Sequence, residues 1–293
     1  MVTNLSFDFI NKKVGFHFLS STLLAFSIAL LFFKGLNFGV DFIGGTTIQI
    51  QFEKKISVEV IKKKLKNTQF EKSTVTYFGG ENEILIKFKN SSNNLNNDLG
   101  DEISNILKST GNFNIRKIDM VGPKVGKELQ EKGIAALTLS LLMILIYVSF
   151  RFEWKFAIAS ISALIHDIII TLGFISIFAI EVNLDILAAL LTILGYSLND
   201  TIIVFDRIRE TLNNLKNKTT SLINVLNKAI NNSLSRTLIT SLTTFFVVLT
   251  LFIFGGDIIF GFSFTLLIGV IIGTYSSIFI ASTFLITLDF SIP

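Results

Sequence analysis

Six long runs of apolar residues, separated by polar segments, dominate the pattern along the chain. Each is long enough for a helix that crosses the ~30 Å hydrocarbon core of a bilayer, which takes ~20 apolar residues. We expect helices because hydrocarbon offers no hydrogen-bond partner to a free backbone N–H or C=O group. The expected transmembrane helices are residues 14–33, 134–150, 156–180, 186–205, 237–254 and 262–288.

The positions of Lys and Arg predict the orientation of these spans. If the N-terminus is cytoplasmic, segments 1–13, 151–155 and 206–236 lie inside and carry ten Lys and Arg residues. The short outer loops 181–185 and 255–261 then carry none. This bias follows the positive-inside rule, which long loops obey less strictly. Both termini are therefore expected in the cytoplasm, with residues 34–133 outside.

The large outer segment 34–133 predicts a small folded domain within residues 46–121. Its pattern has the order β-α-β-β-α-β, which is typical of a ferredoxin-like α+β fold. Gly79-Gly80-Glu81-Asn82 predicts a turn, and Asn90 to Asn97 forms a polar connection. The expected elements are Thr46 to Phe52, Ser57 to Asn67, Thr74 to Phe78, Ile84 to Lys89, Leu99 to Leu107 and Phe113 to Met120.

Charged residues within the spans are the candidates for function, because an ionisable group in a membrane is costly without a partner. Asp200 lies in the fourth span and Asp167 near the middle of the third, beside His166. Arg236 directly precedes the fifth span. Each has a structural alternative: Asp200 as a packing or snorkelling carboxylate, Arg236 as a membrane anchor, and the His-Asp pair as two residues that satisfy each other.

Smaller polar and apolar patterns surround these charges. Asn199 adjoins Asp200, and the fifth span carries a polar stripe suited to hydrogen bonds between helices, made of Thr237, Thr240, Ser241 and Thr244. The sixth span has small residues at four-residue spacing, which predict close helix packing: Gly269, Gly273, Ser277 and Ala281.

The cytoplasmic segment 206–236 carries apolar residues at helical spacing, with several lysines nearby. This pattern favours a helix lying along the membrane surface. The apolar positions are Leu222, Val225, Leu226, Ala229 and Ile230, and the lysines are Lys216, Lys218 and Lys228.

Composition narrows the classes of function. Half of the 293 residues are hydrophobic and 16% are charged, which excludes a disordered chain and disfavours a soluble enzyme. There is no Cys, so neither a disulfide framework nor a cysteine nucleophile is present. Phosphate-loop and zinc-protease motifs are also absent. The net charge of +4 fits anchoring to anionic headgroups better than nucleic-acid binding.

Several ordered motifs resemble the SecD/SecF family of the bacterial protein translocase, within the resistance-nodulation-division superfamily. They match SecF more than SecD, and the outer region is small for SecD. The matching segments are Gly35 to Thr46, Val121 to Gly126, Arg151-Phe152-Glu153, Ala163 to Asp167, Gly195 to Glu210 and Ser235 to Thr244.

The resemblance implies a non-enzymatic subunit of the bacterial inner membrane, half of a twelve-helix unit completed by a SecD-like subunit. It would assist late steps of preprotein export at the SecYEG channel, beside other translocon accessory proteins. Asp200 and Arg236 would couple export to H⁺ or Na⁺ movement, with Asp167 as a further candidate, and no other cofactor is expected. The alternatives are a small-molecule or lipid exporter of the same superfamily and a passive scaffold of the channel.

Overall fold

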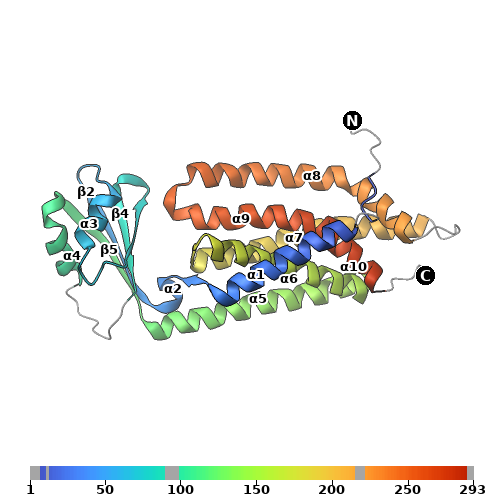
Figure 1. Ribbon diagram of the computed structural model, residues 1–293, viewed down its shortest axis with the longest axis horizontal. Helices are drawn as coiled ribbons and strands as arrows, with labels where there is room; N and C mark the ends of the chain where they lie inside the picture. Colours follow the sequence, from blue (N-terminus) through green and yellow to red (C-terminus); the bar gives the residue numbers. More distant parts are fainter. Residues whose placement is uncertain (1–6, 11–12, 90–98, 215–221, 289–293) are drawn as a thin grey trace.

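The computed structural model describes residues 7–10, 13–89, 99–214 and 222–288. It shows a long bundle of helices with a small α+β domain at one end (Figure 1). Most of the expected cytoplasmic N-terminus, the polar run Asn90 to Asn97, and Lys216 and Lys218 lie outside the described residues.

In the described part of the chain, six helical segments are long and apolar enough to cross a membrane, as the apolar runs predicted. The sixth contains a π-helical turn, in which the backbone hydrogen bonds span one residue more than in an α-helix. The segments are α1 (Lys13–Phe33), α5 (Pro123–Arg151), α6 (Trp154–Ile177), α7 (Leu184–Asn214), α8 (Leu222–Phe254), and α9 (Gly256–Ser276) continued by the π-helical turn η2 (Ser277–Ala281) and α10 (Ser282–Thr287).

Three helices extend well beyond the apolar runs that predicted them. Helix α5 begins at Pro123, α7 continues to Asn214, and α8 begins at Leu222. The prediction that the apolar face of segment 206–236 lies on the membrane is wrong for the described residues. Val225, Leu226, Ala229 and Ile230 are buried inside the protein, in one core with residues of α6, α7 and α10.

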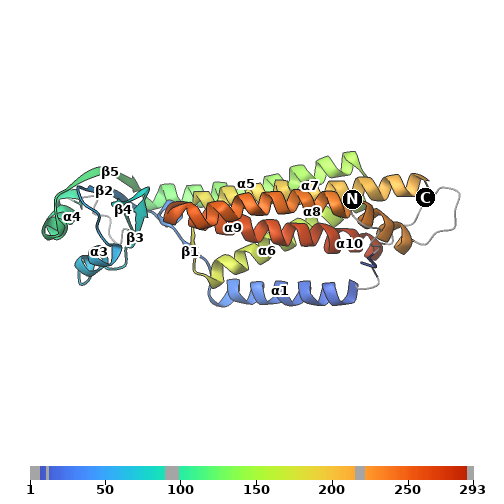
Figure 2. The same ribbon diagram turned by 90° about the horizontal axis from the view of Figure 1, so that it is seen from above.

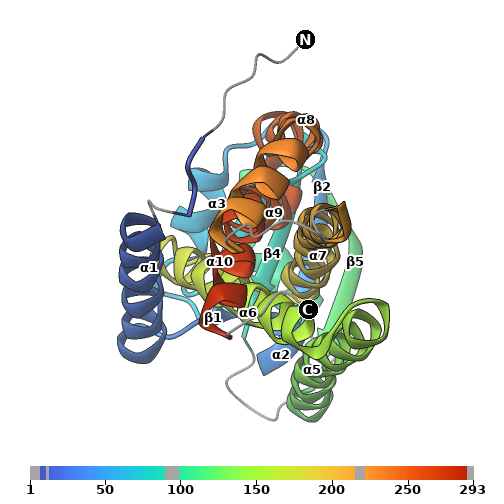
Figure 3. The same ribbon diagram turned by 90° about the vertical axis from the view of Figure 1, so that its right-hand side faces the viewer.

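Helices α6 and α7 form the centre of the bundle. In their most apolar windows 56% and 44% of residues are buried, against 11% in α1 and α5. Figure 2 shows α1 along one edge beside α6, and Figure 3 shows α1, α5 and α8 at the perimeter. The outer helices therefore present apolar side chains outward, whereas α6 and α7 can hold polar groups away from lipid.

The α+β domain has the predicted β-α-β-β-α-β order. Its four strands form one antiparallel sheet in the order β3-β4-β2-β5. A short 3₁₀ turn, η1 (Lys108–Thr110), follows the second helix. The elements are β2 (Gly45–Phe52), α3 (Val58–Leu65), β3 (Thr74–Phe78), β4 (Gly80–Phe88), α4 (Leu99–Leu107) and β5 (Phe113–Val121).

The domain has its own hydrophobic core between the sheet and its two helices. Alternate residues of β2, among them Ile48 and Ile50, are fully buried against Ile61 of α3 and Ile103 of α4. Ser57 caps α3, because its Oγ accepts a 3.2 Å hydrogen bond from the backbone N–H of Glu59. The expected four-residue turn is tighter than predicted, since β4 already begins at Gly80.

Glycines allow the connections between domain and bundle to cross at close range. The short helix α2 (Val40–Ile43) packs against the start of α5. A Cβ added at Gly126 would lie 2.9 Å from the backbone of Gly44 and Phe42, so only glycine fits there. Two-residue strands β1 (Asn37–Phe38) and β6 (Glu181–Val182) pair beside this crossing.

Candidate functional site

Asp200 lies on the inward face of α7 and is fully buried. Its Oδ2 accepts a 3.2 Å hydrogen bond from the hydroxyl of Ser241 on α8. Its Oδ1 has no hydrogen-bond partner among the described residues. A carboxylate can accept about four hydrogen bonds, so Asp200 is far from satisfied.

Two further hydroxyls extend the surroundings of Asp200. Thr237 lies one helical turn before Ser241 on α8, is fully buried, and its Oγ1 also has no partner among the described residues. On the other side, the hydroxyls of Ser241 and Thr274 of α9 lie 2.8 Å apart. Asp200 is thus connected to both α8 and α9 by hydroxyl groups that can donate or accept a hydrogen bond.

Asp167 is equally buried, but both of its carboxylate oxygens have partners. Its Oδ1 lies 3.1 Å from Nδ1 of His166. Its Oδ2 accepts hydrogen bonds from the hydroxyls of Ser197 on α7, at 2.6 Å, and Ser276 on α9, at 2.8 Å. Asp167 therefore joins three helices, and its carboxylate is stabilised by three polar contacts.

A chain of polar groups continues from Asp167 to α1. Nε2 of His166 lies 3.3 Å from the hydroxyl of Ser20. That hydroxyl lies 2.9 Å from the hydroxyl of Tyr275, which donates to the carbonyl of Phe16 at 2.8 Å. The polar chain thus runs from α1 through α6 to α7 and α9.

The two carboxylates belong to one polar cluster. Ser197, which contacts Asp167, lies three residues before Asp200 on the same face of α7. On α9, Thr274 and Ser276 lie two residues apart, and they contact Ser241 and Asp167, respectively. The cluster thus combines a satisfied carboxylate with one that has an unpartnered oxygen.

Arg236, Thr240 and Thr244 of α8 do not form hydrogen bonds or ion pairs with the buried carboxylates in the described structure. Arg236 is exposed, and among the described residues it forms no ion pair with Asp200. The hydroxyls of Thr240 and Thr244 bond to backbone carbonyls one turn earlier on α8, while Thr237 and Ser241 face inward. Asn199 is exposed beside Asp200.

Glycines on α9 bring it against α7. A Cβ at Gly269 would overlap the side chain of Ile193, and one at Gly273 would lie 3.0 Å from the Cβ of Ser197. Ser277 follows at the start of the π-helical turn and donates to the carbonyl of Thr274 at 3.0 Å. In this arrangement Ser276 contacts Asp167 directly, and Thr274 contacts Ser241, which donates to Asp200.

The sequence patterns did not identify several of the hydroxyl residues around the two carboxylates. The only feature of the sequence that could have indicated them is the presence of polar residues within the first, fourth and sixth apolar runs. Such residues also occur where helices simply pack closely, so the pattern does not single them out. The missed residues are Ser20, Ser197, Thr274, Tyr275 and Ser276. No group of three or more His, Cys, Asp or Glu residues suited to a metal ion occurs in the part of the chain that the structure describes.

Two family models match the chain. The C-terminal model of the SecD/SecF protein export membrane proteins covers residues 102–291, and the SecD/SecF GG motif covers residues 29–56. The second match includes Gly44 and the first includes Gly126, the two glycines at the crossing between α2 and α5. Together the two matches cover β2 and the last elements of the α+β domain. They also cover each of the six long helices, wholly or in part.

Curated relatives called protein translocase subunit SecF are similar over nearly the whole chain. The protein from Helicobacter pylori strain J99 is 49% identical over 92% of this chain and 84% of its own length. The protein from Vibrio alginolyticus is 47% identical over 92% of this chain and 86% of its own length. That from Escherichia coli O157:H7 is 41% identical over 94% and 86%.

The fold is also similar to that of a solved structure. The crystal structure of SecDF from Thermus thermophilus, described as a translocon-associated membrane protein, matches 99% of this chain with a TM-score of 0.85 and 33% identity. This chain spans 40% of the length of that protein. The chain therefore belongs to the SecF family of protein translocase subunits.

Proposed function

We propose that this subunit uses the movement of H⁺ or Na⁺ through the membrane to promote late steps of preprotein export. The observation that supports this best is the buried carboxylate of Asp200, whose Oδ1 has no partner in the described structure. Asp200 and Arg236 are the proposed ion-coupling residues, with Asp167 as a further one. Asn199 and the α8 stripe of Thr237, Thr240, Ser241 and Thr244 support them.

An unsatisfied carboxylate in a membrane protein is suited to bind and release a cation. A buried charge in a membrane is costly unless it is neutralised or paired. A proton or Na⁺ at Asp200 would neutralise it, and the hydroxyl of Thr237 on α8, which has no partner among the described residues, would offer a further polar contact. Asp167 already has three partners, which suits it better to hold α6, α7 and α9 together.

The energy available from one ion is enough to bias such a site. Moving one charge through ~100 mV releases ~2.3 kcal/mol. That free energy shifts a two-state equilibrium about 50-fold. Approach of Arg236 in one state, and its withdrawal in the other, would tie ion binding to helix movement.

The proposed partner is a SecD-like subunit, which would complete a twelve-helix unit. The similar SecDF protein from Thermus supports this, because the present chain corresponds to only 40% of its length. We propose that the pair acts beside the SecYEG channel and other translocon accessory proteins. The α+β domain would contact the emerging preprotein through its surface or a sheet edge.

The proposed orientation places both termini in the cytoplasm of a bacterium and the α+β domain outside its inner membrane. The start of α1 and the helix α10 both lie at the end of the bundle opposite the α+β domain (Figure 1). The basic loop residues Arg151 and Arg209 lie together there, since Arg209 donates to the carbonyl of Arg151. This arrangement agrees with the positive-inside rule.

The replacement Asp200→Asn tests the proposal. It removes the charge but keeps the size of the side chain, so ion-dependent export should be lost while the complex with the SecD-like subunit still co-purifies. Asp206→Asn is the matched control on the same helix, because Asp206 is partly exposed and pairs with Arg151. Full ion-dependent export in the Asp200 variant would refute the proposal.

The same assay separates the two alternatives. A passive scaffold predicts normal export by Asp200→Asn whenever the complex assembles. An exporter of small molecules or lipids predicts no dependence on a SecD-like subunit or on the SecYEG channel. Export that requires the ion gradient, the partner and Asp200 together supports the proposed function.

A further inference from the structure

The α+β domain is attached to the bundle by two crossing chains at one place. The chain passes into the sheet at Gly44 and Gly45 and leaves it at Val121 and Gly122, and Gly45 is the register partner of Val121. Gly44 has φ +90°, and a Cβ there would lie 2.8 Å from the backbone nitrogen of Pro123. One connection contains Gly44 and Gly45 and the other contains Gly122. Because glycine restricts the backbone least, the domain can turn about this crossing, which we call the pivot.

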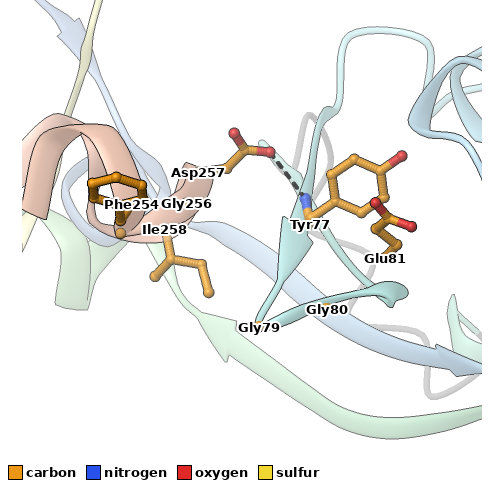
Figure 4. Close-up of a pocket in the computed structure, with 9 residues that line it drawn as sticks. Tyr77, Gly79, Gly80, Glu81, Phe254, Gly256, Asp257 and Ile258 are labelled. Carbon is orange, nitrogen blue, oxygen red and sulfur yellow. Dashed lines mark hydrogen bonds between the residues drawn. The ribbon is translucent and has the colours of Figure 1, made fainter.

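Away from this pivot, the domain contacts the start of α9. The backbone N–H of Tyr77 on β3 donates a 3.3 Å hydrogen bond to Oδ2 of Asp257, in the first turn of α9 (Figure 4). Both sides of the contact are tight turns with a glycine in the left-handed region, Gly79 at φ +76° and Gly256 at φ +70°. The domain therefore meets the helix where two tight turns face each other.

The contact is not sealed by close packing. Asp257 is exposed, and a cavity of about 310 Å³ separates the hairpin turn from the turn between α8 and α9. The cavity is lined by Glu81 on one side and Phe254 and Ile258 on the other. Opening this contact would expose little apolar surface that is now buried, so it can break and re-form.

Helix α9 connects this contact with the buried carboxylates. Ser276 donates to Asp167, and Thr274 lies beside Ser241, which donates to Asp200. Asp257 begins the same helix, about 28 Å away at 1.5 Å per residue. A helix transmits displacement along its axis, so a shift of its inner half also moves Asp257.

We propose that the contact between the Tyr77 amide and the Asp257 carboxylate is a reversible latch through which α9 controls the orientation of the α+β domain. When the latch is closed, the domain follows α9; when it opens, the domain turns about the pivot at Gly44 and Gly122. The latch rests on the proposed function, because ion binding at Asp200 supplies the movement of α9.

Removing the carboxylate tests the latch in the complete complex with the SecD-like subunit. Asp257→Ala should lower ion-dependent export roughly fivefold, within the range reported for residues that carry coupling between sites. Ion flux through membrane vesicles and assembly should stay normal. Asp185→Ala, which removes an exposed carboxylate from the first turn of α7, is the matched control. Normal export by Asp257→Ala would overturn the latch.

A cross-link tests whether the latch must open. The chain contains no cysteine, so Glu81→Cys and Ile258→Cys introduce one thiol on each wall of the cavity. A cleavable cross-linker with two thiol-reactive groups would join the two cysteines. The cross-link should stop ion-dependent export, and cleaving the cross-linker should restore it. Each single-cysteine variant, treated with the same reagent, is the control. Full export by the cross-linked protein would contradict the proposal.

The two proposals fail in different ways. If the latch is wrong and the ion site is right, Asp257→Ala exports normally while Asp200→Asn does not. If the ion site is wrong, Asp200→Asn exports normally, and the cross-linked protein still reports whether the domain must move.

Discussion

Ser276 of α9 donates its hydroxyl to the carboxylate of Asp167 on α6 at a distance of 2.8 Å. Ser197 of α7 donates to the same oxygen at 2.6 Å, and His166 lies against the other. Asp200, one turn farther along α7, has a single hydrogen bond among the described residues, from Ser241. The two buried acids of this bundle therefore stand in opposite surroundings, one fully partnered and one not.

This contrast predicts different effects on stability. Asp167→Ala should destabilise the protein by about 2–4 kcal/mol, because buried donors that lose their acceptor keep the cost of desolvation. Asp200→Ala should be neutral or stabilising, because it removes a poorly satisfied buried charge. Thermal unfolding of the detergent-solubilised protein measures both. Equal losses in the two variants would show that Asp200 has more support than its contacts indicate.

Ser241 is the only described hydrogen-bond donor to Asp200, and its replacement should weaken ion coupling. A hydrogen bond to a charged group contributes about 1.5–3 kcal/mol, so Ser241→Ala should lower ion-dependent export about tenfold. Ser233→Ala is the control, since this buried serine of α8 donates to the carbonyl of Ile230. Comparable export rates in the two variants would remove Ser241 from the site.

The contact between α9 and α7 predicts that Gly269 tolerates no side chain. A Cβ there would overlap Ile193, so Gly269→Ala should destabilise the protein by about 1–3 kcal/mol. The second change Ile193→Ala should recover part of this loss by making room. Gly195→Ala, on α7, is the control, because its Cβ would have no atom within 4 Å. Unfolding temperatures of the four proteins test the packing.

Much of the architecture could be predicted because hydrophobicity reports burial in lipid directly. The six spans and the β-α-β-β-α-β order followed from apolar run length and from alternation. The apolar runs did not predict where α5 and α8 begin or where α7 ends. Hydrophobicity changes at the membrane border, whereas a helix can continue beyond it through polar residues. The apolar stripe near Val225 was assigned to the membrane because a buried face and a lipid-facing one have the same pattern.

The candidate site was only partly predictable for a similar reason. Asp167 and Asp200 stood out because ionisable residues are rare in apolar spans. Their serine and threonine partners did not, because the same residue types pack helices throughout the bundle. Three-dimensional packing alone distinguishes Ser276, which holds Asp167, from Ser282, which donates to a backbone carbonyl of η2. The approach of Arg236 to Asp200 stays a prediction.

The α+β domain should fold without the bundle, because its core contains only its own residues. A fragment of residues 45–121 should give dispersed NMR spectra and a cooperative unfolding transition. In this fragment Ile48→Ala should cost about 3 kcal/mol, since Ile48 is fully buried in the central strand. Val60→Ala, at a side chain that is 44% exposed, should change stability by less than about 1 kcal/mol. A fragment that lacks cooperative unfolding would show that the domain depends on α2 and α5.

The first turn of α3 predicts a specific dependence on pH. The hydroxyl of Ser57, and then the backbone N–H of Glu59, hold the pKa of the Glu59 carboxyl below its ordinary value of 4.5. A lowered pKa in the folded state stabilises the domain above the unfolded pKa, and this contribution disappears as the pH falls through the folded value. Glu59→Gln should therefore be less stable than the original fragment at neutral pH, and the difference should close in acid. NMR titration of Glu59 provides the direct measurement, and a midpoint at or above 4.5 would contradict the assignment. In Ser57→Ala the midpoint should rise toward the ordinary value, because the largest cause of the shift has been removed.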